Sequence, residues 1–191
     1  FLQRAVDFAR EHDIIIAYDN PYCDLTFEGY RAPSILEIPG AKEVAVEFNS
    51  LSKTYNMAGW RVGMVVGNAQ AIAALMTVKT NVDSGIFRPV QDAAVAALTG
   101  DQSWIAERNL IYQRRRDIIL GWLPKIGMSA RTPKGSLYVW AKVPEGVDSE
   151  EFALRILEET GVWMTFGTAF GDNGQGYMRL SMCVPEERLM E

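Results

Sequence analysis

Apolar residues recur at a helical spacing in several parts of the chain. At its start, one helical face collects four apolar residues: Leu2, Ala5, Val6 and Ala9. This face predicts an amphipathic helix over residues 1–10. The same spacing predicts three further helices, over residues 69–79, 89–98 and 101–123.

Short runs rich in β-branched residues lie between these helices and predict strands. Residues 14–17 (Ile-Ile-Ile-Ala) have the composition of a strand buried in a parallel sheet. Residues 44–48 and 62–66 predict two more strands, the second bounded by glycines. Strands that are joined by helices in this way are typical of an α/β layer with a parallel sheet.

The pattern changes after Pro124. Residues 136–142 alternate like a strand, Asp148 or Ser149 is placed to cap a helix that runs to about residue 160, and two more strands are expected over residues 162–165 and 177–182. We therefore expect two domains, residues 1–115 and a small α+β domain of residues 116–191. Because the chain begins and ends inside expected helices, we also expect it to be part of a longer protein.

Composition narrows the class of protein. The 191 residues are 48% hydrophobic and 23% charged, which is typical of a soluble globular chain, and no apolar run reaches the roughly 20 residues of a membrane span. A net charge of −5 argues against nucleic acid as a partner. Cys23 and Cys183 are predicted to be buried free thiols in a reduced cytoplasm. With His12 as the sole histidine, we expect neither a catalytic triad nor a metal site.

The residues best suited to chemistry cluster around one lysine. The stretch Ser50-Leu51-Ser52-Lys53 follows an expected strand, and Arg61 comes shortly afterwards between glycines. Hydroxyl and guanidinium groups beside an amine are what a phosphate-bearing ligand needs. Asp19 and Tyr22 follow an earlier strand, at the end where open α/β sheets bind ligands.

These motifs together resemble a known family. Asp-x-x-Tyr, then Ser-x-Ser-Lys about thirty residues later, then an arginine shortly after the lysine, is similar to the signature of fold-type-I pyridoxal-phosphate enzymes of the aspartate aminotransferase class. The sequence around Lys53 looks closest to the LL-diaminopimelate aminotransferase-like branch of this family. The resemblance implies an α/β fold, with part of a mostly parallel large-domain sheet and its flanking helices, followed by a small α+β domain.

The resemblance implies a role for each residue of the cluster. Lys53 would hold the cofactor pyridoxal 5′-phosphate covalently and move protons. Asp19 would pair with the ring nitrogen, and Tyr22 would donate to the ring oxygen. Ser50 and Arg61 would bind the phosphate, with help from Ser52.

The resemblance also implies substrates and partners. Arg179, in the expected strand over residues 177–182, matches the arginine that grips the substrate carboxylate, and Arg88 is a weaker candidate for a second acidic group. Local pairing of Arg88 is the alternative. The expected reaction moves an amino group from an amino acid (LL-diaminopimelate, an aspartate- or glutamate-like acid, or an aromatic one) to a 2-oxo acid, in a cytoplasmic homodimer.

Three alternatives stay open at this point. The same residues serve carbon–sulfur lyases of the fold type, and some transcription regulators use an aminotransferase-like domain to bind an effector. The third alternative is an inactive fragment. In the family, the preceding half supplies a glycine-rich phosphate turn, an aromatic residue stacked on the cofactor and an asparagine at the ring oxygen. This chain by itself is therefore expected to bind the cofactor weakly.

Overall fold

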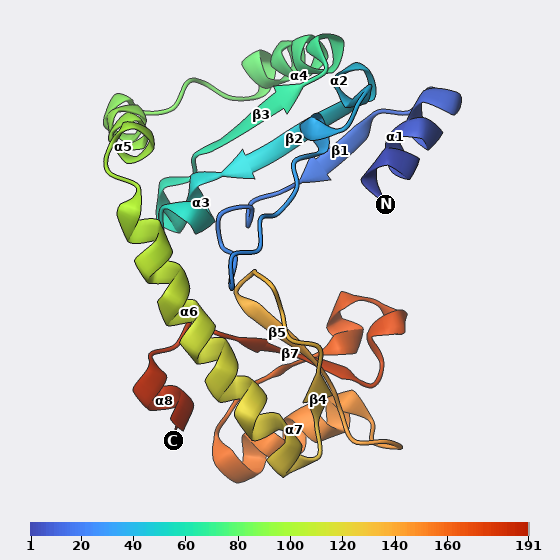
Figure 1. Cartoon of the computed structure of the whole chain (residues 1–191), viewed down its shortest axis with the longest axis vertical. Coiled ribbons are helices and arrows are strands. Elements are labelled where there is room, and N and C mark those ends of the chain that lie inside the picture. The colour runs from blue at the N-terminus through green and yellow to red at the C-terminus, as the bar shows by residue number, and fades with distance from the viewer. Residues whose placement is uncertain (191) are drawn as a thin grey trace. The chain divides into compact units, whose positions relative to one another are not determined.

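The structure is a computed structural model that describes residues 1–190. The chain forms two compact units, Phe1–Ile105 and Ala106–Glu191, each with its own sheet and helices (Figure 1). The division falls inside the long helix α6 (Ser103–Trp122). The expected domain boundary between residues 115 and 116 lies farther along the same helix and stays a prediction.

The sheet of the first unit has the strand order β1 (Ile16–Asp19), β2 (Ala45–Ser50) and β3 (Gly63–Gly67). β1 and β2 are parallel, as expected, with Asp19 opposite Phe48. β3 is antiparallel to β2, as the arrows of Figure 1 show, and its Gly63 lies opposite Ser50. The start of β3 therefore lies at the sheet edge where β1 and β2 end.

Helical segments connect and flank these strands. They are α1 (Leu2–Glu11), η1 (Ile35–Glu37), α2 (Ala41–Val44), α3 (Leu51–Thr54), η2 (Ala58–Trp60), α4 (Ala69–Val82) and α5 (Arg88–Thr99). One core cluster joins Val6 of α1 to Ile35 and Ala45. A second cluster joins Leu51 of α3 to Ala94 of α5, which anchors the turn that follows β2.

The first expected strand is displaced and less buried than predicted. It begins at Ile16, while Ile14 and Ile15 are 46% and 49% exposed. The reason is the exit from α1: Asp13 takes a left-handed conformation, and the amide of Ile14 donates to the carbonyl of Ala9 at 2.9 Å. These residues therefore finish the helix before the strand can start.

The second unit contains a four-stranded antiparallel sheet in the order β4-β5-β7-β6. After α6, its elements are η3 (Leu123–Ile126), β4 (Ser129–Ala130), β5 (Tyr138–Lys142), α7 (Ser149–Thr160), β6 (Thr165–Phe166), η4 (Gly167–Phe170), η5 (Asp172–Gly174), β7 (Tyr177–Ser181) and α8 (Glu186–Met190). One face of β5 and β7 is core, with Val139, Ala141 and Met178 completely buried.

One expectation for this unit is confirmed, and a second is confirmed only in part. Asp148 does cap α7, since its carboxylate accepts from the amides of Glu150 and Glu151 at 2.9 and 3.0 Å. The strand expected over residues 162–165 is reduced to Thr165–Phe166. Val162 is 52% exposed and its amide donates to the Thr160 hydroxyl, so this segment completes the end of α7 instead.

The prediction of two buried thiols is wrong for Cys183, which is exposed. It follows the end of β7, and its amide turns back to the hydroxyl of Ser181 at 3.2 Å. Cys23 is half-buried, and both cysteines are free. Among residues 1–190, no helix combines the length and the apolar character that a membrane crossing requires.

Candidate functional site

The carboxyl ends of β1 and β2 meet at one edge of the first unit's sheet, because the two strands are parallel. Side chains alternate between the faces of a strand, so Asp19, Phe48 and Ser50 share one face. Glu47 and Asn49 point to the opposite face. Asp19, at the end of β1, is exposed to solvent.

Lys53 lies on the single turn of α3 that follows β2 directly. Ser50 begins this turn: its hydroxyl accepts from the amide of Ser52 at 3.1 Å, and Ser52 itself is buried. Lys53 is half-buried, and its Nζ lies 5.6 Å from the ring centre of Tyr22, a cation–π distance. The structure thus brings the predicted lysine and tyrosine together across 31 positions of sequence (22 to 53).

A second contact ties the same two segments. Thr54 is buried, and its hydroxyl donates to the carboxylate of Asp24 at 3.1 Å. Cys23 is also held there, because its thiol donates to Asn49 Oδ1 at 3.1 Å. Burial, together with the charge of Asp24, raises the pKa of Cys23 to about 11, so this thiol stays protonated and is a poor nucleophile.

Arg61 lies between η2 and β3, close to the end of β2. The amide of Leu51 donates to the carbonyl of Val62 at 3.1 Å, which joins the segment after Arg61 to the turn that carries Lys53. Arg61 is exposed, and its Nη1 donates to the carbonyl of Ala58 at 2.9 Å.

Arg88 forms a local ion pair at the start of α5. Its Nε donates to Asp92 at 2.8 Å, one helical turn away, and both side chains are more than half exposed. This is the local pairing that the sequence left as an alternative. A role of Arg88 toward substrate stays a prediction.

Arg179 belongs to the second unit, on β7 opposite Trp140 of β5. Its guanidinium carbon lies 4.3 Å from the ring centres of both Tyr138 and Phe170. Two rings at this distance hold the planar guanidinium by cation–π attraction, which orients its N–H groups. Tyr138 and Phe170 therefore lie on either side of the guanidinium as the two walls of a clamp.

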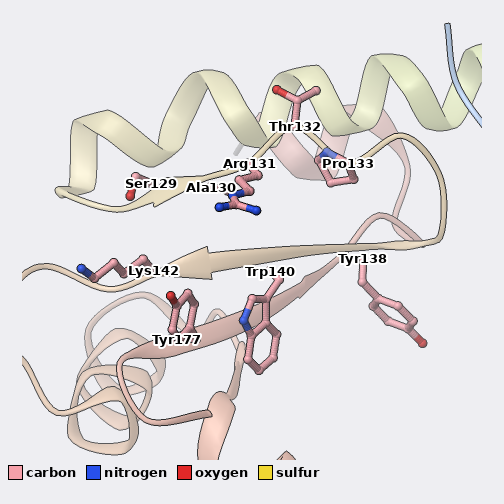
Figure 2. A pocket seen from close by; sticks show the side chains of 9 residues that line it. All are labelled: Ser129, Ala130, Arg131, Thr132, Pro133, Tyr138, Trp140, Lys142 and Tyr177. Carbon is pink, nitrogen blue, oxygen red and sulfur yellow. The ribbon is translucent and has the colours of Figure 1, made fainter. Parts of the chain in front are cut away.

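The same face of β5 and β7 continues into an open pocket of about 800 Å³ (Figure 2). Trp140 and Tyr177 line it as a nearly parallel pair with ring centres 5.6 Å apart. Arg131 and Lys142 supply positive charge to the lining. The second unit thus presents a cationic and aromatic surface beside Arg179.

A sequence profile described as "Aminotransferase class I and II" matches residues 1–191. The chain belongs to this aminotransferase family. Members of the family generally depend on pyridoxal phosphate.

Curated relatives of this aminotransferase chain carry a more specific name. It is 51% identical over 189 residues to an LL-diaminopimelate aminotransferase of Dehalococcoides mccartyi, a match that covers 99% of the chain and 49% of the relative. It is 49% identical to an LL-diaminopimelate aminotransferase of Moorella thermoacetica, and this match covers 100% of the chain and 49% of the relative. The chain spans about half the length of the curated relatives it matches.

Solved aminotransferase structures show the same fold. Apo-BacF from Bacillus subtilis superposes with a TM-score of 0.93 at 38% identity, over 99% of this chain and 51% of that one. A probable N-succinyldiaminopimelate aminotransferase from Thermus thermophilus superposes with a TM-score of 0.93 at 38% sequence identity. The superposition covers 99% of this chain and 50% of that one. The α/β fold class expected from the sequence is therefore confirmed.

Two features of the candidate site were not predicted from the sequence. Glu47 is buried on β2, and a charged residue inside the strand expected over residues 44–48 was the available signal. Phe170 faces Arg179 from a short 3-10 turn, and nothing in the sequence around Phe170 indicated this contact.

Proposed function

We propose that this chain is the part of a pyridoxal-phosphate-dependent aminotransferase that carries the cofactor lysine, Lys53. The observation that supports the proposal best is the meeting of this lysine with Tyr22, at 5.6 Å, beside the strand end that carries Asp19. The family match over the chain points the same way.

The donor groups of the first unit match the chemical parts of the cofactor. Lys53 offers an amine for the aldehyde, and Asp19 offers an exposed carboxylate for the protonated ring nitrogen. Tyr22 offers a phenol for the ring oxygen. Ser50 and Arg61, with Ser52 in support, offer hydroxyl and guanidinium groups for the phosphate.

Pyridoxal phosphate, when bound, supplies an aldehyde that joins amines covalently and a ring that accepts electrons from the substrate. Lys53 Nζ would hold it and, once displaced by the substrate amine, would take the proton from the substrate Cα. Asp19 would keep the ring nitrogen protonated, since an ion pair favours the charged form. Tyr22 would lie beside the lysine amine and limit its contact with water.

Arg179 would bind the α-carboxylate of the substrate. Its guanidinium lies between two rings and presents paired N–H groups, which suit a carboxylate better than a single ammonium does. The relatives' name supports LL-diaminopimelate, a diamino dicarboxylic acid, as the amino donor and a 2-oxo acid as the acceptor. Arg88 is proposed for the second carboxylate. We further propose a cytoplasmic homodimer.

The reaction can be tested with the chain, pyridoxal phosphate in excess and LL-diaminopimelate. Excess cofactor offsets the weak binding expected of a chain about half as long as its relatives. Pyridoxamine phosphate should form faster than with Lys53→Ala, which reports the uncatalysed background. With an S-alkylcysteine in place of LL-diaminopimelate, release of ammonia with pyruvate would instead favour lyase chemistry. A rate of pyridoxamine phosphate formation equal to that of Lys53→Ala would refute the proposal.

A further inference from the structure

Glu47 is a buried carboxylate in the middle of β2. It is 4% exposed, and within residues 1–190 no other acidic side chain is buried to this degree. No ion pair reaches it from an arginine or lysine of those residues. A buried charge without a cation is costly, so something else must stabilise it.

Hydrogen bonds from four donors supply that stabilisation. Oε1 accepts from the side-chain amides of Asn20 and Asn49 at 3.0 and 3.1 Å. Oε2 accepts from the Ser34 hydroxyl and from the backbone amide of Ile35, the latter at 3.1 Å. Burial raises the pKa of Glu47, but these four hydrogen bonds outweigh burial and hold the pKa below its ordinary value. The carboxylate is therefore ionised at neutral pH.

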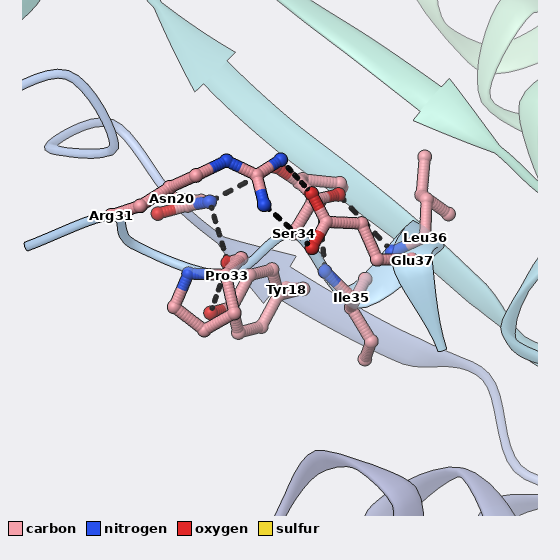
Figure 3. Close-up of polar contacts among 9 residues, drawn as sticks. Tyr18, Asn20, Arg31, Pro33, Ser34, Ile35, Leu36 and Glu37 are labelled. Atoms are coloured by element: carbon pink, nitrogen blue, oxygen red, sulfur yellow. Dashed lines mark hydrogen bonds and ion pairs between the residues drawn. The ribbon is translucent and has the colours of Figure 1, made fainter. Parts of the chain in front are cut away.

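The donors belong to three segments that are far apart in sequence. Asn20 directly follows β1, Asn49 lies near the end of β2, and Ser34 caps the start of η1 in the long loop between the two strands. Figure 3 shows that loop packed beside Asn20, whose amide also reaches the carbonyl of Pro33 at 3.4 Å. Tyr18 donates to the same carbonyl at 3.2 Å. One carboxylate therefore fastens the loop to both strand ends.

Each fastened segment carries a residue of the proposed cofactor site. Asn20 follows Asp19 directly, and Asn49 precedes Ser50. Asn49 also accepts from the thiol of Cys23, the neighbour of Tyr22. Glu47 lies on the opposite face of the sheet from Asp19 and Ser50, so it cannot touch a ligand bound on their face.

We propose that Glu47 is a positioning residue, which holds the two strand ends and the Tyr22 turn in place from the rear face of the sheet. This inference rests on the proposed function of Lys53, Tyr22 and Asp19. Its closing experiment separates the two, because one arm needs no cofactor.

The cofactor-free arm measures amide hydrogen exchange in the whole chain. Glu47→Gln should speed exchange about tenfold at Asn20, Leu25, Ile35 and Leu36, whose amides are bonded within or beside the network. Exchange in β5 and β7 of the second unit should not change. Glu37→Gln is the matched control, since Glu37 lies on the same loop but only forms an exposed pair with Arg31. Unchanged exchange in Glu47→Gln would overturn the inference.

The second arm treats the chain with pyridoxal phosphate and borohydride and locates the labelled lysine by peptide mass. Glu47→Gln should lower the label on Lys53 about tenfold relative to the exposed Lys79, while Glu37→Gln leaves that ratio unchanged. Faster exchange with an unchanged ratio would overturn the positioning role. If the unmodified chain shows no preference for Lys53, the proposed function itself fails, and this inference falls with it.

Discussion

Replacing Glu47 with glutamine should destabilise the chain by about 3 kcal/mol, and the estimate follows from the four hydrogen bonds. Glutamine keeps one acceptor oxygen. The least costly arrangement turns that oxygen toward Asn20 and Asn49 and its NH₂ group toward Ser34 and Ile35. The Ser34 hydroxyl can rotate to accept, but the Ile35 amide cannot.

The size of the effect has two parts. A buried amide without an acceptor costs about 1–3 kcal/mol. The remaining hydrogen bonds lose the assistance of the charge, at about 1 kcal/mol each, and part of this loss is offset because a buried charge is removed. The sum is large against a typical total stability of about 5–15 kcal/mol.

Urea unfolding followed by tryptophan fluorescence measures the change. Glu37→Gln, with its exposed ion pair, should stay within about 0.5 kcal/mol of the unmodified chain. A double-mutant cycle with Ser34→Ala should give a coupling of about 1–2 kcal/mol. A loss below about 1 kcal/mol for Glu47→Gln, or additive effects in the cycle, would refute the argument from hydrogen bonds.

Three further predictions rest on particular side chains and glycines of the structure. Because the folded pKa of Glu47 is depressed, its ionisation stabilises the chain above the ordinary pKa of 4.5, and this stability is lost as the pH falls through the folded value. The urea midpoint should therefore fall less steeply with decreasing pH in Glu47→Gln than in the unmodified chain. Equal slopes of midpoint against pH in the two proteins would contradict this. At pH 8 a thiol reagent should modify exposed Cys183 before Cys23, because a pKa of about 11 leaves the thiol of Cys23 almost wholly protonated. Peptide mass analysis shows which cysteine is modified first, and earlier modification of Cys23 would contradict this. Gly174→Ala should destabilise the second unit, since its Cβ would lie 2.0 Å from the carbonyl oxygen of Gly167. Gly121→Ala is the control, because Gly121 has open space around it and is not left-handed; thermal midpoints compare the two variants, and an equal loss would contradict the steric argument.

Features determined by neighbours in sequence were predictable. Asp148 could be identified as a helix cap because its partners, Glu150 and Glu151, lie only two and three positions further along the chain. Ser50 and Lys53 could be placed at a strand end because the apolar run stops just before them. Such features depend on local spacing, which one sequence contains in full.

Features determined by distant partners were not predictable. Glu47 is stabilised by residues 13 and 27 positions away, and nothing in residues 44–48 identifies them. The antiparallel direction of β3 depends on pairing with β2 and not on its own composition. Arg179 could be proposed only through a resemblance, and its aromatic neighbour Phe170 became visible only when the chain was folded.

The most direct test of the central proposal is the site of cofactor attachment in the unmodified chain. Pyridoxal phosphate and borohydride together fix a cofactor-bearing lysine permanently, and peptide mass analysis identifies it. The proposal predicts that Lys53, half-buried beside Tyr22, carries more label than exposed Lys79, and that Lys53→Ala removes this preference. Label distributed evenly over the lysines of the chain would contradict it.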